Sequence, residues 1–189
     1  MYLDLLEDSN LYKFLFQIDQ DLAEQAGRSP CRFCGARLHS ACYLRRPRGL
    51  PAGVDPGPGF TVCFSFCCSR EGCRRRHRPP SVRFLGPKVY LAVCVALITF
   101  MRQGSTPRTT GQLKKLFRVD RRTLSRWRRW WQTIFPITAF WRRMRARFMP
   151  PVQDADLPQS LVERFTQDAV LERVVTMLRF LSTTMATPF

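Results

Sequence analysis

Hydrophobic residues recur at helical spacing near both ends of the chain, while the middle loses that periodicity. In residues 1–26 the apolar stripe consists of Leu3, Leu6, Leu11, Leu15 and Ile18. This stripe predicts an amphipathic helix that Gly27 ends. At the other end, Ser160 is expected to cap a last helix that runs to about Leu181. Residues 88–102 are apolar nearly all round, which predicts a buried helix with Pro87 before its first turn.

Residues 112–131 have the pattern of a helix-turn-helix. Residues 110–117 form its first short helix, capped by Thr109 or Thr110, and residues 118–120 form the turn, with Val119 filling the angle between helices. Asp120 is a favourable N-cap for the second helix, 121–131. The inner face of that helix carries Leu124, Trp127 and Trp131. Its outer face carries Arg121, Arg122, Ser125, Arg126, Arg128 and Arg129. This division predicts a recognition helix for a DNA major groove.

The remaining elements complete a fold that is mainly α with a small zinc-ribbon β element. Residues 60–66 and 82–85 are predicted strands, and residues 49–59 are a loop by composition. Pro136 ends the recognition helix at the latest, and residues 137–148 form another helix, which Met149-Pro150-Pro151 ends. We expect an N-terminal helix (1–27), a zinc-ribbon-like domain (28–86), a trihelical helix-turn-helix domain with a basic extension (87–149), and a linker with a C-terminal amphipathic helix (150–189).

The charge distribution points to a polyanionic partner. The net charge is +17, and residues 28–149 hold 27 of the 31 basic residues with only three acids, a local net charge of +24. Such a block predicts nucleic-acid binding, above all to double-stranded DNA. The two ends are acidic, so we expect the terminal helices either to dock a separate protein or to shield the basic block.

The eight cysteines point to a metal. The N-terminus is acidic and amphipathic, so we expect no signal peptide. The longest apolar run, residues 89–101, is shorter than a membrane span, so we expect no membrane partner. In the reducing cytoplasm, closely spaced cysteines suggest a metal site more than disulfides. The expected location is cytoplasmic, associated with the nucleoid.

The cysteine spacing predicts a structural zinc site. Cys31 and Cys34 have two residues between them and are followed by Gly35, as in a zinc knuckle. Cys68 and Cys73, with Gly72 before the second, are the preferred other half. Cys67 competes with Cys68, but adjacent strand residues face opposite ways, so only one can reach the metal. Further alternative ligands are His39, Cys42 and His77. Cys63 and Cys94 are expected to be core thiols.

Two more arginine clusters are expected to contact phosphate. The first follows the second pair of cysteines and comprises Arg74, Arg75, Arg76, Arg78 and Arg83. The second lies on the 137–148 helix and comprises Arg142, Arg143, Arg145 and Arg147. Both would position the protein on the nucleic-acid backbone, while the recognition helix specifies the sequence.

Several segments resemble a family of small bacterial proteins associated with mobile elements. They are Cys-Arg-Phe-Cys-Gly from Cys31, Arg-Arg-Pro-Arg-Gly from Arg45, Phe-Ser-Phe-Cys-Cys from Phe64, Pro-Pro-Ser-Val-Arg-Phe-Leu-Gly from Pro79 and Val-Tyr-Leu-Ala-Val from Val89. Residues 31–131 are also similar to the zinc ribbon plus helix-turn-helix of insertion-sequence transposases. The resemblance implies specific DNA binding at element ends by Arg121, Arg122, Ser125, Arg126 and Arg129.

This chain departs from those transposases in its carboxylates. A transposase of that kind holds two metal ions on three spaced carboxylates, whereas here the acids after residue 131 are few and clustered. We therefore expect an accessory or regulatory DNA-binding factor without catalysis. The alternatives are an RNA-binding subunit of a ribonucleoprotein or defence complex, a transcription regulator, a small nuclease and a protein-interaction subunit.

Overall fold

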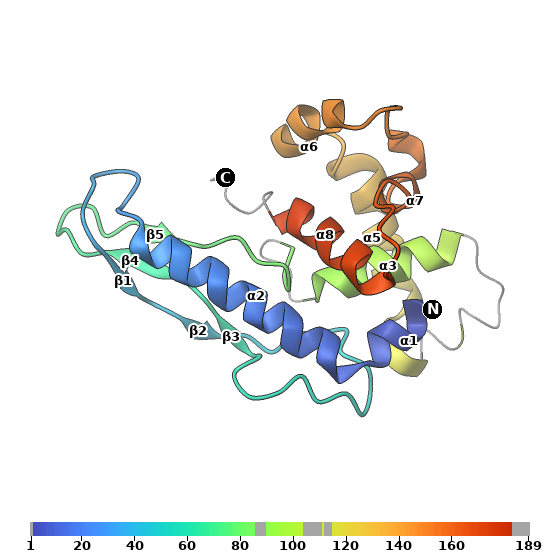
Figure 1. Ribbon diagram of the computed structural model, residues 1–189, viewed down its shortest axis with the longest axis horizontal. Helices are drawn as coiled ribbons and strands as arrows, with labels where there is room; N and C mark the ends of the chain where they lie inside the picture. Colours follow the sequence, from blue (N-terminus) through green and yellow to red (C-terminus); the bar gives the residue numbers. More distant parts are fainter. Residues whose placement is uncertain (1, 86–89, 104–110, 112–114, 183–189) are drawn as a thin grey trace.

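The computed structural model describes residues 2–85, 90–103, 111 and 115–182, and this part of the chain is about half helical. Figure 1 shows the long helix α2 (Ser9–Arg28) lying beside the strands at one end of the molecule. The helices α3 (Ala92–Gln103), α5 (Arg121–Arg129), α6 (Ala139–Met144), α7 (Gln159–Val162) and α8 (Val170–Ser182) gather at the other end. We call the strand-bearing residues 28–44 and 62–80 the cysteine arm.

The N-terminal segment is helical as predicted, but it contains two helices. Helix α1 (Tyr2–Glu7) ends before Asp8, whose carboxylate caps α2 by accepting a hydrogen bond from the Asn10 N–H at 2.8 Å. Gly27 does not end α2, which continues to Arg28. A Cβ at Gly27 would lie 2.9 Å from the Phe66 ring. The glycine therefore allows α2 to approach the strands closely.

The cysteine arm is a bent antiparallel hairpin with one added strand. Strands β1 (Leu38–Ser40), β4 (Phe66–Cys68) and β5 (Arg76–His77) form one sheet in the order β1-β4-β5. Strands β2 (Tyr43–Leu44) and β3 (Val62–Cys63) form a second. The predicted strand 60–66 is therefore wrong in extent. The chain bends at the buried Ser65, whose carbonyl accepts from the Ala41 N–H at 2.8 Å.

Residues 82–85 are buried but do not form the predicted strand. Apart from a single bridge between Phe84 and Leu91, their backbone groups bond elsewhere. The Val82 N–H donates to the Asp19 carboxylate at 2.7 Å, and the Phe84 N–H donates to the Ser81 hydroxyl at 3.2 Å. A side chain of α2 thus takes the place of a neighbouring strand.

The helical end of the molecule packs around α3 and an aromatic cluster. Residues 92–98 are almost completely buried, which confirms the prediction of a buried helix. The observed helix begins at Ala92, and residues 86–89 lie outside the described part. Helix α5 packs against α3. The centroid of the Phe135 ring lies 4.9 Å from that of Trp131 and 5.0 Å from that of Trp141.

The last predicted helix, from Ser160 to Leu181, is wrong in its continuity. Helices α7 and α8 are separated by residues 163–169. Within this break Phe165 is buried and its ring contacts Phe180 at a centroid distance of 5.9 Å. Ser160 is not the cap but lies inside α7, where its hydroxyl donates to the Gln153 carbonyl at 2.7 Å. Burying Phe165 therefore takes precedence over continuing the helix.

Candidate metal centre and basic surfaces

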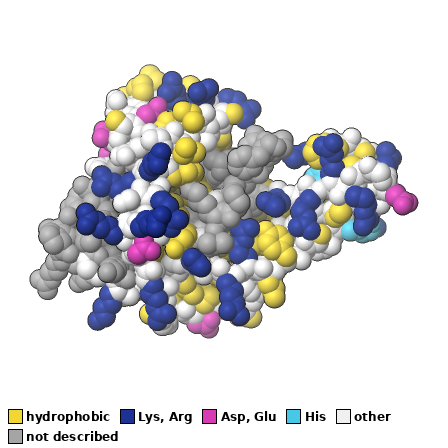
Figure 2. Space-filling model, turned by 180° about the vertical axis from the view of Figure 1, so that it is seen from behind, with side chains coloured by type: hydrophobic (Ala, Val, Ile, Leu, Met, Phe, Trp, Pro, Cys, Tyr) yellow, Lys and Arg dark blue, Asp and Glu magenta, His cyan; other side chains and the backbone are white. Residues whose placement is uncertain are grey.

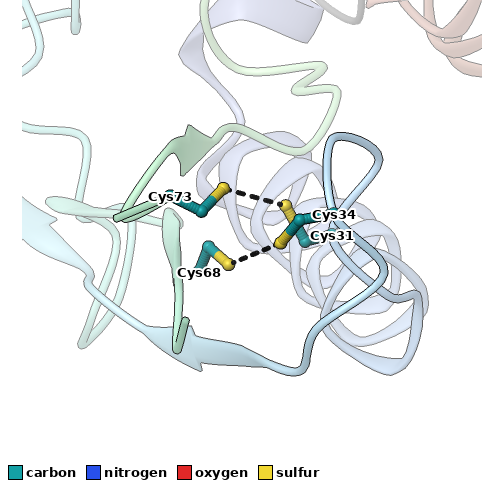
Figure 3. A group of neighbouring side chains, drawn as sticks. All are labelled: Cys31, Cys34, Cys68 and Cys73. Carbon is teal, nitrogen blue, oxygen red and sulfur yellow. Dashed lines mark hydrogen bonds between the residues drawn. The ribbon is translucent and has the colours of Figure 1, made fainter. Parts of the chain in front are cut away.

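Four cysteines from separate parts of the arm meet at one point. The sulfur atoms of Cys31, Cys34, Cys68 and Cys73 all lie within 4.8 Å of one another. Figure 3 shows Cys31 and Cys34, from the turn after α2, facing Cys68 and Cys73 from the strand side. The Sγ–Sγ distance is 3.8 Å for Cys31 and Cys73 and 3.3 Å for Cys34 and Cys68. All four could bind one metal ion together.

The spacing of the sulfurs fits a tetrahedral metal site. With metal–sulfur bonds of ~2.3 Å, a regular tetrahedron separates its sulfurs by ~3.8 Å. Of the two pairs drawn in Figure 3, Cys31 and Cys73 have this separation and Cys34 and Cys68 are closer together, but both distances are far longer than the ~2.05 Å of a disulfide bond. The chemistry of the donors, four thiols in one pocket, suits a thiophilic ion such as zinc.

Local backbone geometry brings each pair of cysteines together. In the first turn, the N–H groups of Cys34 and Gly35 both donate to the Cys31 carbonyl, at 3.3 and 2.8 Å. Gly35 has a φ of +72°, which a residue with a side chain rarely adopts. In the second turn, the N–H groups of Cys73 and Arg74 both donate to the Arg70 carbonyl at 3.1 Å. The two turns therefore have the same construction.

Strand alternation separates Cys67 from Cys68. Cys68 is fully buried, and its side chain lies in the cluster. Cys67 is partly exposed, and its thiol donates to the Arg74 carbonyl at 3.3 Å instead. The preferred set Cys31, Cys34, Cys68 and Cys73 is the set that the structure brings together.

Of the other alternative ligands, only His77 lies beside the cluster. His39 and Cys42 are exposed on and after β1, and they are not part of the cluster found among the described residues. The Nε2 atom of His77 lies 3.2 Å from the Cys31 sulfur, within hydrogen-bond distance, but His77 is not part of the group whose ligand atoms all lie close together. His77 is therefore placed to orient a ligand. Cys63 and Cys94 are buried away from the cluster, as predicted.

Hydrogen bonds prepare one of the thiols for metal binding. Burial raises the pKa of Cys31, but the backbone N–H groups of Phe33 and Cys34, together with His77, outweigh burial and lower the pKa to about 6. Burial raises the pKa of Cys68 to about 12, so this thiol keeps its proton at neutral pH. A bound metal ion removes such a proton because it stabilises the thiolate directly.

Helix α5 has the two faces that its sequence predicts. Leu124 and Trp127 are each 5% exposed and Trp131 is fully buried. The Asp120 carboxylate caps the helix by accepting from the Thr123 N–H at 2.6 Å, as predicted. Val119 is 2% exposed, in the turn before the helix. After Arg129 the chain continues as a π-helix, Trp130–Ile134, so the α-helical part is shorter than 121–131.

The outer face of α5 is exposed along its whole length. Its members are Arg121, Arg122, Ser125, Arg126, Arg128 and Arg129. Ser125 donates its hydroxyl hydrogen to the Arg121 carbonyl, and Arg126 donates to the Thr123 hydroxyl at 2.9 Å. Half of the preceding predicted helix, residues 110–117, lies outside the described residues, and its described residues, 111 and 115–117, are helical.

The two further arginine clusters are only partly available to a ligand. Arg74, Arg75, Arg76 and Arg78 are exposed on the arm. Arg83 is not, because it is 1% exposed and its Nε donates to Asp19 at 2.7 Å. The expectation that Arg83 contacts phosphate is therefore wrong. Arg142, Arg143, Arg145 and Arg147 are exposed on α6 and the 3-10 helix after it (Arg145–Arg147). Of these, Arg145 is ion-paired with Asp154 at 3.0 Å.

The acidic ends of the chain lie together but are not uniformly exposed. Helix α1 packs against α8. Asp4, Glu7 and Glu172 are exposed on these helices. In contrast, Asp19 is buried, and the Asp154 carboxylate accepts hydrogen bonds from Trp141 and Arg145. Neither Asp19 nor Asp154 is therefore available to a docking partner.

Phe33 was not singled out from the sequence. This side chain lies between two cysteines of the cluster and is 44% exposed. An aromatic residue inside a short metal-binding turn has no core to enter, and that position alone could have drawn attention to it.

Comparison with protein-family models, curated proteins and solved structures finds no match to this chain. In the described part of the chain, no helix combines the length and the hydropathy needed to cross a lipid bilayer.

Proposed function

We propose that this chain is a zinc-containing protein that binds double-stranded DNA, with α5 as its recognition helix and without catalysis of its own. The observation that carries the proposal is the two-faced α5. A helix with a buried apolar face and an outer face of five arginines and a serine matches the way a helix is presented to a major groove.

The distribution of charge supports this proposal. Figure 2 shows Lys and Arg side chains over both the arm and the helical end, with few acids between them. Residues 28–149 carry a net charge of +24, far more than solubility requires. Such a surface suits a polyanion, and the arginines of the arm and of α6 would contact the DNA backbone while α5 contacts bases.

The four-cysteine cluster supports a structural role for zinc. A site closed by four thiolates leaves no position open for water or substrate. The strands around it are only two or three residues long, and they have few apolar contacts of their own. Metal binding would therefore supply much of the free energy that folds the arm. The protein would act as an accessory or regulatory factor, as the resemblance to mobile-element proteins implies.

The test is selection of duplex DNA from a random pool by the zinc-loaded protein, at two salt concentrations. A steep dependence of affinity on salt together with an enriched motif is the expected result. Enrichment of no motif, or stronger binding to structured RNA of the same length, would overturn the assignment to sequence-specific DNA binding.

Variants of α5 then test the recognition helix. Arg122→Ala and Arg126→Ala are expected to lose ~1–3 kcal/mol of preference for the motif over an unrelated duplex, if the side chain contacts a base edge. Arg179→Gln, on the exposed side of α8, is the matched control for removing one positive charge. An unchanged preference for the motif in both α5 variants would contradict the assignment of α5 as the recognition helix.

A further inference from the structure

The segment that follows β2 presents two exposed arginines on one side of an extended chain. We call residues 45–54 the basic loop, because they contain three arginines and no acid. Arg46 and Arg48 are exposed, whereas Pro47 between them is partly buried and Gly49 is buried. Such alternation is typical of extended backbone, so the two arginines lie on the same side, ~6.6 Å apart along the chain. Neither side chain forms an ion pair or a hydrogen bond with another described residue.

The backbone of the basic loop is fixed against the start of α3. Arg48 forms a parallel bridge with Tyr90, and its carbonyl accepts from the Leu91 N–H at 3.0 Å. The carbonyl of Gly49 accepts from the Cys94 thiol at 2.8 Å. Gly49 has a φ of +90°, and a Cβ there would lie 3.2 Å from the Cβ of Cys94. These contacts hold the backbone in place and leave the arginine side chains on the surface.

The same loop is attached to both helices of the predicted helix-turn-helix. The Tyr90 ring, beside Arg48, meets the ring of Trp127 edge-on at a centroid distance of 4.9 Å. Trp127 belongs to the buried face of α5. The Ala52 N–H donates to the Leu116 carbonyl at 3.3 Å, in the short helical segment that precedes the turn. The basic loop therefore lies beside the unit that presents α5, although its sequence continues from the cysteine arm.

We infer that Arg46 and Arg48 contact the backbone phosphates beside the bases that α5 reads. This inference rests on the proposed function, because the same DNA would contact α5. It adds a contact surface next to the recognition helix, and it assigns a binding role to two residues outside the arginine clusters recognised in the sequence.

The construction of the loop favours phosphate as the ligand of these arginines. A guanidinium group can donate to two oxygens of one phosphate. Pro47 fixes its own φ and keeps Arg46 in extended backbone, and the contacts of Arg48 and Gly49 fix the other side. Less conformational entropy is therefore lost on binding than for arginines on an unsupported loop. Phosphate contacts of this kind set the orientation in which a recognition helix enters the groove.

The experiment measures the affinity of the zinc-loaded full chain for its selected DNA duplex over a range of salt. Arg46→Gln and Arg48→Gln should each reduce the slope of log affinity against log salt by about 0.9, and the double variant by about 1.8. Each single change should weaken binding about five- to tenfold near ~0.1 M salt. Preference for the motif over an unrelated duplex should not change, because phosphate contacts carry no sequence information.

Neutral phosphate analogues then locate the contacts. A duplex with one methylphosphonate linkage lacks a single backbone charge, and a set of such duplexes scans the site. At a contacted position the linkage should weaken binding of the wild type, but it should weaken binding of Arg48→Gln or Arg46→Gln less, because the contact is already lost. Purely additive losses at every position would contradict a direct contact.

The control variant is Arg179→Gln, which removes one exposed charge from α8 and should leave the slope unchanged. Zinc content and circular dichroism confirm that each variant is folded. Loop variants with the wild-type slope, while Arg122→Ala loses preference for the motif, overturn the loop contact alone. Loss of that preference in the loop variants would mean that they read bases, which overturns the assignment to phosphate. A wild-type chain without salt-dependent DNA binding overturns the proposed function as well.

Discussion

At the scale of single residues, Cys67 and Cys68 show how one step along a strand changes a side chain's role. Cys68 faces the cluster and is fully buried, while the thiol of Cys67 donates to the Arg74 carbonyl. We expect Cys68→Ser to reduce bound zinc from about one ion per chain to well below one after dialysis against a weak chelator. Atomic absorption measures the content.

The adjacent cysteine is the matched control for that change. Cys67→Ser alters the same kind of side chain on the same strand, β4, and should keep its zinc. The four-cysteine assignment fails if Cys67→Ser loses the metal, or if Cys68→Ser keeps it.

His77 is expected to tune the metal site without binding the ion. Its Nε2 lies 3.2 Å from the Cys31 sulfur, so an N–H there donates to the thiolate and restricts its orientation. Loss of such a supporting hydrogen bond commonly lowers metal affinity about 10- to 100-fold. We expect a loss in this range for His77→Ala, measured by competition with a chromophoric chelator.

His39→Ala is the control for the His77 prediction, because His39 is exposed on β1 and outside the cluster. Equal losses of affinity in the two variants would mean that neither histidine acts through Cys31.

At the scale of elements, a substitution on the buried face of α5 should change stability, and one on its exposed face should change DNA binding. Leu124 is 5% exposed, so Leu124→Ala removes buried contacts and should lower the free energy of unfolding by about 2–5 kcal/mol. Arg128→Ala, on the exposed face, should change it by no more than about 0.5 kcal/mol. Urea unfolding at constant zinc concentration gives both values.

The DNA affinity of the same variants completes this comparison. Arg128→Ala should weaken binding at low salt although its stability is unchanged, since it removes a positive charge from the outer face. A stable Arg128→Ala protein with wild-type affinity over the whole salt range would remove Arg128 from the binding surface.

The sequence predicted the strongly periodic elements and failed where a side chain replaced backbone pairing. Helix α5, with its cap Asp120, and the buried α3 follow from spacing alone. Residues 82–85 have the composition of a strand, yet the Asp19 carboxylate takes the Val82 N–H. That bond joins residues 63 positions apart, and no local pattern contains it.

The set of metal ligands was predictable because it depends on local spacing along the chain. The two residues between Cys31 and Cys34 limit how the thiols can point, and strand alternation separates Cys68 from Cys67. The position of His77 against Cys31 was not predictable, because it depends on the pairing of β4 with β5, which brings His77 opposite Phe66. The burial of Arg83 was not predictable either, because its partner Asp19 lies 64 positions earlier in the chain.

At the scale of the whole molecule, a buried ion pair joins α2 to the segment that leads to α3. Arg83 and Asp19 are each 1% exposed, with Nε and Oδ2 2.7 Å apart. Arg83 also donates to the carbonyls of Phe60 and Val62, and Asp19 accepts from Ser81 and Val82. One guanidinium group thus connects α2, the start of β3 and the segment that leads to α3.

We expect Arg83→Met to lower the free energy of unfolding by about 3–5 kcal/mol, because it leaves the Asp19 carboxylate buried without its cation. Arg28→Met is the control, since it removes an exposed ion pair with Glu24 from the same helix and should cost about 0–1 kcal/mol. The double variant Asp19→Asn/Arg83→Met should be more stable than the sum of the single losses predicts, because it removes both charges. Additive losses in urea unfolding at constant zinc would show that the two side chains stabilise the junction independently of each other.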